Sequence, residues 1–466
     1  MKVFNTLTRN KEEFNPIEEG KVRMYVCGPT VYGKPHVGHA KSYVFFDVVY
    51  RYLTYLGYKV KYVQNITDVG HLVGDVDDGE DKIEKVAKQK LLDPYEIAYE
   101  YENQYFDCMN KLNVLKPSIS SRATGHIIEI IDFIKTLIDK GYAYVTEEGN
   151  VYYEVSKFKG YGKLSNRTLD ETLSGERITI STDKKNPEDF ALWKKAVNGH
   201  IMKWQSPWSV GYPGWHIECS TMAKKYLGNT IDIHGGGMDN IFPHHDCEIA
   251  QSEVANEMPF VNYFLHNNLV TVNGVKMGKS LGNFITLDDL FQKYDPMIIR
   301  FYLLLNHYRK PTDFSDDKII EAQKKYQEIT NVYNKLLNIK ILEEEKHDNE
   351  ISDLIFGYIN AMDDDFNTPL AISYIYEINK RVNSLLNDNK TYFVNQVLEF
   401  YQDKVINILG LKFENKKEDN NNSSIYINYL LELRNEMRLN KNYEVSDKIR
   451  DFLTNNNVEV NDRKLN

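Results

Sequence analysis

Two histidines stand three residues apart in the stretch PHVGH, which ends a Gly- and Pro-rich segment near the start of the chain. If a helix begins there, His36 and His39 lie at its first turn, where free backbone N–H groups and the positive end of the helix dipole favour a phosphate. Both imidazoles could then donate to phosphoryl oxygens, and Gly38 would let a nucleotide approach the backbone. A His-x-x-His pair by itself is more often a surface feature or a helix start, so the motif needs support.

A second stretch of this kind is KMGKS, in the later half of the chain. It contains Lys276, Lys279 and Ser280 and is bracketed by Gly274 and Gly282. Two ammonium groups on a mobile, glycine-rich loop can clamp a triphosphate. Taken alone, the stretch is equally compatible with a solvated basic loop.

Cysteine, histidine and glutamate residues in three further segments have the chemistry of metal ligands. Cys27 follows the apolar run VRMYV, Cys219 lies in GWHIECS, and PHHDCE contains His244 and Glu248. A proline at the first helical position would start a helix there, so that two side chains four residues apart share a face. These donors would form a soft, nearly tetrahedral zinc site.

Spacing alone leaves the ligand set open. Cys247 and His245 are equally reachable on the same segment, and His216, Glu218 and His234 are close in sequence to the other candidates. A buried cysteine or a satisfied core histidine is the commoner explanation for any one of them.

The elements that position these residues have the pattern of an α/β unit. The alternation in KVRMYV predicts a strand, the text from residue 40 to 56 has helical spacing and stops at Gly57, and KVKYVQNIT predicts a second strand. Strand, helix and strand imply a parallel sheet. Such sheets bind ligands at the carboxyl ends of their strands, where PHVGH lies.

Composition limits the class of protein. The 466 residues are 42% hydrophobic, which is ample for a core, and the net charge of −10 argues against general coating of nucleic acid while leaving room for a local basic groove. The four cysteines are sparse and irregular, which favours a reducing compartment over a disulfide framework. Neither a signal-peptide pattern nor a long apolar run is visible, so we expect a cytoplasmic protein without a membrane partner.

The length predicts about two to four domains. The pattern of hydrophobic and polar residues changes several times along the chain, which marks candidate domain boundaries. We expect a parallel-sheet domain in two parts with an insertion between them, followed by a helical bundle, a polar Asn-rich linker and a small C-terminal domain. In that order, the predicted ranges are 1–110 with 201–296, then 111–200, 297–411, 412–424 and 425–466.

PHVGH and KMGKS, in this order and far apart, resemble the His-x-Gly-His and Lys-Met-Ser-Lys-Ser signatures of class I aminoacyl-tRNA synthetases. Val37 stands where isoleucine is commonest, and Gly278 replaces the usual serine, which removes a hydroxyl from the loop. With MYVCGPTVY, NITDV, PGWHIECS, DIHGGGMD, FPHHDCEIAQSE and MDDDFNTPLA, these motifs closely resemble the cysteinyl-tRNA synthetase family over nearly the whole chain.

The resemblance implies a Rossmann-like parallel-sheet catalytic domain with an inserted connective domain, then a helical-bundle anticodon-binding domain and a small C-terminal domain. It implies one zinc ion per chain and Mg²⁺ with ATP. The implied zinc ligands are Cys27, Cys219, His244 and Glu248. The implied ATP-binding residues are His36, Gly38, His39, Asp239, Lys276, Lys279 and Ser280. The implied amino-acid pocket contains Thr67, Trp215 and His234.

The implied activity is that of a monomeric cysteine–tRNA ligase. Such an enzyme activates L-cysteine with ATP, and zinc recognises the substrate thiolate before the cysteinyl group passes to the 3′ end of tRNA(Cys). His36, His39, Lys276 and Lys279 are the implied catalytic residues. One alternative is the related ligase of mycothiol synthesis, which passes cysteine to an amino-sugar and lacks the tRNA-binding tail. Another is an inactive tRNA- or zinc-binding paralogue, which would predict decay of the ATP motifs. The aspartates of MDDDFNTPLA would repel phosphate, so a structural or capping role is expected for them.

Overall fold

The computed structural model divides the chain into two compact units, Met1–Lys412 and Phe413–Asn466, and each is described by itself. The residues that the structure describes are 1–72, 79–168, 183–278, 281–413, 420–440, 442–455 and 458. Two predicted ATP-site residues, Lys279 and Ser280, lie outside them. Of the helices in these described ranges, none combines the length and the apolar character that a membrane crossing requires.

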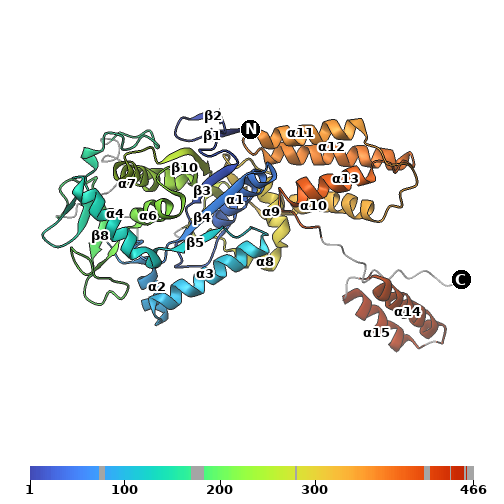
Figure 1. Ribbon diagram of the computed structural model, residues 1–466. Coiled ribbons are helices and arrows are strands. Elements are labelled where there is room, and N and C mark those ends of the chain that lie inside the picture. Colours follow the sequence, from blue (N-terminus) through green and yellow to red (C-terminus); the bar gives the residue numbers. More distant parts are fainter. Residues whose placement is uncertain are drawn as a thin grey trace. The chain divides into compact units, whose positions relative to one another are not determined.

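A parallel sheet forms the centre of the first unit (Figure 1), in the spatial order β11-β10-β3-β4-β5. Every neighbouring pair in it is parallel. Its strands in chain order are β3 (Lys21–Val26), β4 (Lys59–Ile66), β5 (Ile119–Arg122), β10 (Ile231–Gly237) and β11 (Val261–Asn267). The strand order reverses between β3 and β10, and α/β sheets bind ligands at such a switch point.

The predicted strand–helix–strand unit is confirmed. Helix α1 (Val37–Tyr55) connects β3 to β4, and Val44, Val48 and Tyr52, spaced by four, are buried. Gly57 follows the helix with a φ of 90°, a conformation that glycine adopts without strain. A second glycine explains how closely the helix packs, because a Cβ on Gly235 of β10 would lie 2.2 Å from the ring of Phe46.

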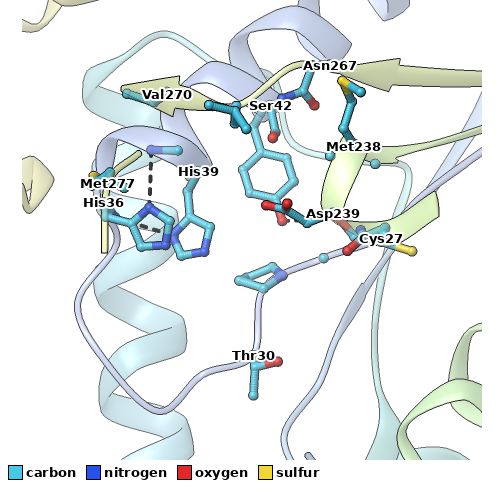
Figure 2. A pocket seen from close by; sticks show the side chains of 18 of the residues that line it. Cys27, Thr30, His36, His39, Ser42, Met238, Asp239, Asn267, Val270 and Met277 are labelled. Carbon is cyan, nitrogen blue, oxygen red and sulfur yellow. Dashed lines mark hydrogen bonds between the residues drawn. The ribbon is translucent and has the colours of Figure 1, made fainter. Parts of the chain in front are cut away.

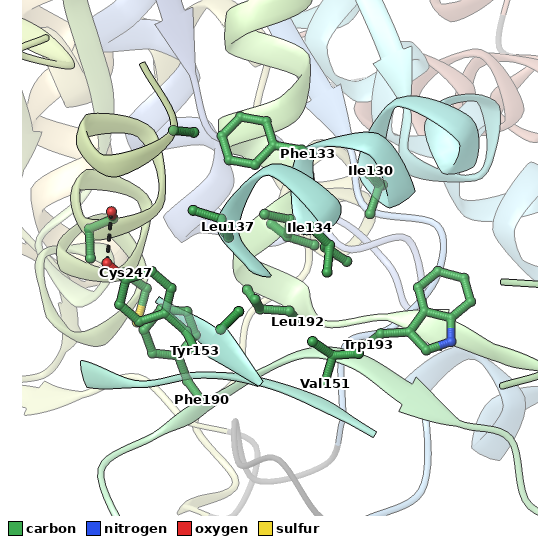
Figure 3. Packing of buried hydrophobic residues seen from close by; sticks show 14 of the residues in the cluster. Ile130, Phe133, Ile134, Leu137, Val151, Tyr153, Phe190, Leu192, Trp193 and Cys247 are labelled. Carbon is green, nitrogen blue, oxygen red and sulfur yellow. Dashed lines mark hydrogen bonds between the residues drawn. The ribbon is translucent and has the colours of Figure 1, made fainter. Parts of the chain in front are cut away.

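An antiparallel sheet in the order β6-β7-β8-β9 forms a separate layer of the first unit. Its strands are β6 (Ala143–Val145), β7 (Val151–Tyr153), β8 (Phe190–Lys195) and β9 (Gly211–Pro213). Helix α4 (Ile127–Asp139) packs Ile134 and Leu137 against Val151 and Leu192 of this sheet (Figure 3). Cys247 belongs to the same apolar cluster.

The insertion therefore has limits that differ from a simple 111–200 block. Strand β5 lies inside that range but pairs in parallel with β4, and β9 lies beyond residue 200. The sheet of the insertion spans Ala143 to Pro213.

The remaining elements of the first unit surround these two sheets. A hairpin of β1 (Lys2–Asn5) and β2 (Asn10–Glu13) starts the chain, and a small sheet in the order β13-β12-β14 follows β11. Its strands are β12 (Val270–Val272), β13 (Val275–Lys276) and β14 (Thr312–Phe314). The helices here are α2 (Lys82–Lys90), α3 (Pro94–Lys111), α6 (Trp215–Leu227), α7 (Asp246–Asn256), α8 (Leu287–Lys293) and α9 (Pro296–Leu304).

Helices dominate the chain from residue 316 onward. In the first unit they are α10 (Asp316–Leu337), α11 (Asn349–Asp363), α12 (Thr368–Asn387), α13 (Val394–Phe400) and the π-helical turn Tyr401–Ile406. The second unit contains α14 (Asn420–Leu439) and α15 (Tyr443–Asn455). Helix α14 begins inside the range predicted as a linker, 412–424.

The aspartates of MDDDFNTPLA attach the helical region to the N-terminal elements. Asp363 accepts a hydrogen bond from Tyr52 of α1 at 2.8 Å, and Asp364 pairs with Lys11 of β2 at 2.6 Å. Asp365 is fully buried and accepts from the hydroxyl of Tyr308 at 2.7 Å. These contacts agree with the structural role expected for the motif.

Candidate active site

A cavity of about 440 Å³ opens at the carboxyl ends of β3 and β10. Figure 2 shows His36 and His39 on one side of it and Cys27 and Asp239 on the other. Of the residues expected in the site, the cavity is lined by Cys27, His36, Gly38, His39, Trp215, Asp239 and Lys276. Among the other expected site residues that the structure describes, Thr67, Cys219, His234, His244 and Glu248 are buried.

The two histidines of PHVGH stand at the start of α1, as predicted. His36 is the N-cap residue, and its Nδ1 accepts a hydrogen bond from the backbone N–H of Gly38 at 3.1 Å. The Nδ1 of His39 accepts from the backbone N–H of His36 at 3.2 Å, and the two rings stack with centroids 3.7 Å apart (Figure 2). Because both Nδ1 atoms accept, a neutral ring carries its proton on Nε2, the atom that can donate to a phosphate.

The start of KMGKS lies across the same cavity. Lys276 ends β13, and its ammonium lies 3.3 Å from a carboxylate oxygen of Asp239. The side chain of Asn283 accepts from the N–H of Gly278 at 2.9 Å and donates to the carbonyl of Lys276 at 3.2 Å. The structure therefore brings the described parts of both signatures to one cavity.

Four of the proposed metal ligands converge from different elements. Cys27 follows β3, Cys219 lies in α6, His244 precedes α7 and Glu248 lies in its first turn. Their ligand atoms all lie within 4.8 Å of one another, and all four residues are buried. The two sulfurs are 4.0 Å apart, and Nε2 of His244 is 3.1 Å from Oε1 of Glu248.

These donors fit a zinc ion. Ligands on a tetrahedral zinc, at its usual bond lengths, stand roughly 3.3–3.8 Å apart, close to the separations seen here. Burial and the neighbouring acidic groups raise the pKa of the Cys27 thiol well above its usual value, and burial also raises the pKa of the Cys219 thiol. Two thiols held together in this way become thiolates when a cation lies between them.

A second donor set shares part of the first. Cys27, His234, His245 and Glu248 also place their ligand atoms within 4.8 Å of one another. Nε2 of His234 is 2.8 Å from Oε2 of Glu248, and Nε2 of His245 is 3.2 Å from the sulfur of Cys27. His245 is also held by His266, at 2.8 Å between ring nitrogens. The two sets share Cys27 and Glu248, and they differ in whether Cys219 and His244 or His234 and His245 complete the group.

The other candidate ligands point elsewhere. Cys247 is buried in the apolar cluster of the insertion (Figure 3). Its sulfur lies 3.4 Å from the hydroxyl of Tyr161. It belongs to neither donor set among the described residues. Glu218 accepts a hydrogen bond from the hydroxyl of Thr67 at 3.0 Å, and Nδ1 of His216 lies 2.8 Å from Nδ1 of His244.

The expectation that helical backbone begins at Pro243 is confirmed, because Phe242 is the non-helical residue within Ile241–His245 and the residues after it are helical as far as α7. Residues Ile241–His245 form a π-helical turn, and α7 begins at Asp246. Phe242 is extended, with φ −135° and ψ 133°, because the residue before a proline is pushed away from the helical conformation. His244 and Glu248 face each other.

The expected amino-acid pocket adjoins the metal-ligand cluster. The indole of Trp215 stacks on the ring of His244 with centroids 4.4 Å apart. The same indole also stacks on the ring of His71, with centroids 4.0 Å apart and an interplanar angle of 12°. Trp215 therefore lies between the cavity and a candidate ligand.

Sequence reasoning missed His71 and Thr30, which both line the cavity. Nδ1 of His71 lies 2.6 Å from the hydroxyl of Thr30, and its Nε2 lies 2.7 Å from the ammonium of Lys82. The signal that could have found His71 is its place just after the second strand of the parallel sheet, at the ligand-binding edge.

Comparison with known proteins agrees with this geometry. A family model described as the class I (C) tRNA synthetase catalytic domain matches residues 13–324, and a DALR domain model matches residues 357–414. The chain is 50% identical to a cysteine–tRNA ligase of Chlorobaculum tepidum, over 99% of this chain and 97% of the relative. It is 47% identical to a cysteine–tRNA ligase of Bacteroides fragilis, again over 99% and 97%.

Solved structures show the same fold at low sequence identity. A Mycobacterium tuberculosis methionyl-tRNA synthetase in complex with methionyl-adenylate has a TM-score of 0.61 and 14% identity, covering 84% of this chain and 90% of that one. A ternary LeuRS–tRNA–LeuAMS complex from Agrobacterium radiobacter K84 agnB2 has a TM-score of 0.61 and 12% identity, covering 86% and 85%. The sequence relatives and the shared fold lead to one conclusion: this chain belongs to the cysteine–tRNA ligase family of class I tRNA synthetases.

Proposed function

We propose that the protein activates L-cysteine with ATP and then transfers the cysteinyl group to the 3′ end of tRNA(Cys). The observation that supports this most strongly is the convergence of two buried thiols, a histidine and a glutamate directly beside the cavity that both ATP signatures reach. The cysteine–tRNA ligases that match nearly all of the chain support the same activity.

In the first step, a carboxylate oxygen of cysteine attacks the α-phosphorus of ATP. A bond from that phosphorus to oxygen forms, the bond to the bridging oxygen breaks, and pyrophosphate leaves. Positioning and charge stabilisation supply most of the acceleration in such a displacement. Mg²⁺ would accompany the triphosphate.

His36 and His39 bind the phosphates through their Nε2 atoms, and Gly38 leaves room for the nucleotide. Lys276 and Lys279 stabilise the negative charge that develops on pyrophosphate, with Lys279 the more critical. Ser280 and Asp239 complete the ATP site. Lys276 reaches the phosphates only by leaving Asp239, and since that ion pair is largely exposed, breaking it costs about 1 kcal/mol or less.

Cys27, Cys219, His244 and Glu248 would hold zinc, which, when bound, supplies a soft Lewis acid that binds the substrate thiol as a thiolate. The pocket residues then orient the rest of the amino acid. Trp215 closes one wall by stacking on His244. His234 holds Glu248 at 2.8 Å, and Thr67 holds the buried Glu218. A serine substrate would lose the soft ligand, and valine or alanine would have none, so no editing site is needed.

In the second step, a hydroxyl of the terminal ribose of the tRNA attacks the carbonyl carbon of cysteinyl-adenylate, and AMP leaves. We assign acceptor-end binding to the inserted region and stem or anticodon binding to the helical region and the second unit. The match of a DALR domain model to residues 357–414 supports this assignment.

The alternative acceptor is an amino-sugar, as in the cysteine ligase of mycothiol synthesis. It shares the zinc and ATP motifs, so the first step cannot separate the two activities. Cysteine-dependent exchange of pyrophosphate into ATP is the test of activation, and transfer of labelled cysteine to a tRNA(Cys) transcript is the test of the acceptor. Exchange without transfer to tRNA would contradict the proposal and favour the amino-sugar.

A further inference from the structure

Lys41 is an unusual residue for the helix that carries PHVGH. It lies in the first turns of α1, its side chain is only 5% exposed, and its ammonium donates to the carbonyl of Leu269 at 3.1 Å and to that of Lys310 at 2.7 Å. No carboxylate contacts it in the described part of the chain, and burial lowers the pKa of Lys41 to about 7. A buried ammonium without a counter-charge opposes folding, so its contacts must do something that an apolar side chain would not.

The two carbonyls belong to the sheet that carries the KMGKS loop. Leu269 directly precedes β12, and Lys310 lies just before β14. The carbonyl of Leu269 also accepts from the N–H of Thr312, which starts β14, so the lysine binds the point where these parallel strands begin. Strand β13, which ends at Lys276, is paired to β12 in this same sheet.

The chain on the far side of the KMGKS loop is also attached to the start of α1. The N–H of Val37 donates to the carbonyl of Ile285 at 3.3 Å, and the N–H of Leu287 donates to that of Pro35 at 2.9 Å. These backbone contacts fix the chain that follows the KMGKS loop, at Ile285 and Leu287. Lys41 fixes the sheet that contains β13, the strand from which the loop begins. A Cβ on Gly38 would lie 3.8 Å from the end of Met277, so the two signatures nearly touch between these attachments.

We infer that Lys41 is a positioning residue of the ATP site, which fixes the sheet bearing the KMGKS loop in register with the helix bearing PHVGH. It touches neither ATP nor cysteine. It acts through two backbone carbonyls and sets the distance between Lys276 and the histidines across the cavity. The inference rests on the proposed function, since it concerns how ATP is held.

The test measures cysteine-dependent ATP–pyrophosphate exchange for Lys41→Met, which keeps the length and apolar stem but donates nothing. A misplaced reacting group costs up to about 10²-fold, so we expect kcat/KM for ATP to fall by about 10-fold or more. The KM for cysteine should stay within about twofold, because the thiol cluster has no contact with Lys41. Lys41→Arg, which keeps a charged donor, should recover part of the loss.

A second readout does not need turnover. Lys276 is largely exposed, so trypsin should cut the KMGKS loop and bound ATP should protect it. Half-protection of Lys41→Met should require about 10-fold more ATP than the wild type. The matched control is Lys194→Met, another buried lysine, which donates to the hydroxyl of Tyr152 in the inserted sheet. It should lose stability without changing the ATP dependence.

Two results for Lys41→Met would overturn the inference. One is an equal change of the KM for ATP and the KM for cysteine. The other is a wild-type KM for ATP in the exchange assay together with a wild-type ATP requirement for tryptic protection. If Lys41→Met does not fold, Lys41→Gln decides, because a shorter amide can reach one carbonyl at most and should still weaken ATP binding. A wild type that lacks cysteine-dependent exchange but shows ATP protection would contradict the proposed function and leave the tryptic test of Lys41 intact.

Discussion

The ion pair of Asp47 with Arg300 and the cluster around Cys27 are both buried, yet their polar groups find partners in different ways. Arg300 donates to Asp47, to the carbonyl of Leu409 at 2.8 Å and to that of Leu112 at 2.9 Å. Asp47 also accepts from the N–H of Leu115 at 2.8 Å. Every charge in this pair meets a protein group, so nothing further is needed.

The cluster around Cys27 has acceptors and thiols facing one another. Neither Cys27 nor Cys219 forms a disulfide, and Glu248 contacts His234, His244 and the thiol of Cys27 but no lysine or arginine among the described residues. Such a set is stable and useful when a cation lies at its centre. The contrast separates a structural charge pair from the proposed metal site, and the following substitutions test that difference.

The largest effect is expected from Cys219→Ser, which replaces a soft ligand by a hard one at nearly constant size. Zinc should no longer bind stoichiometrically, and cysteine-dependent exchange should fall by at least about 10³-fold. Metal content and exchange are measured on the same preparation. Cys247→Ser is the matched control, since that thiol lies in the apolar core, and its zinc content should not change. Loss of zinc in the control but not in Cys219→Ser would reverse the assignment.

Arg300→Met tests the structural ion pair, and it should lower stability without changing the proposed zinc site. It removes one of the two arginines that pair with the buried Asp47, while Arg51 stays at 2.8 Å, so it should cost up to about 3–5 kcal/mol of unfolding free energy. Zinc content and the KM for cysteine of the folded protein should be unchanged. Denaturant unfolding measures the unfolding free energy. Loss of zinc from the folded Arg300→Met protein would show that the two clusters are not independent.

His245→Gln separates the two overlapping donor sets. If His244 is the ligand, His245 only orients its neighbours, and such orienting groups change metal affinity by about 10–100-fold. One zinc per chain should therefore remain at saturating metal, with weaker retention against a chelator. A complete loss of the site, together with normal binding in His244→Gln, would favour the second set.

The smallest effect on stability is expected at the exposed pair of Lys276 and Asp239. Exposed ion pairs contribute about 1 kcal/mol or less, so Asp239→Asn should leave the unfolding free energy nearly unchanged. The KM for ATP should change, since Asp239 adjoins the proposed phosphate site. A stability loss comparable to that of Arg300→Met would remove the distinction between exposed and buried charge in this protein.

The sequence predicts the parts of this fold that repeat a local pattern. The strand before Cys27, the helix after His36 and the strand that follows have periods of two and 3.6 residues, and the helix start carries its own capping residue. The proposed ligand set could be named because its residue types are rare and its motifs resemble a family. In these regions local preference and tertiary structure agree.

Other features depend on contacts between distant residues, which leave no periodic signal. Asp47 and Arg300 are 253 positions apart, and neither stands in a motif. Lys41 appears in the sequence as one more polar residue of an amphipathic helix. The π-helical turn Ile241–His245 was not predicted, although helical backbone does begin at Pro243 as expected. His71 was missed because a single histidine after a strand carries no spacing to interpret.

The central claim is that the buried cluster binds zinc and thereby selects cysteine. Its most direct test is the charging of a tRNA(Cys) transcript by one preparation before zinc removal, after removal and after zinc is restored. The account predicts one zinc per chain, charging with cysteine and not with serine, loss of charging on removal and recovery on addition. Unchanged cysteine charging by protein without zinc would contradict it.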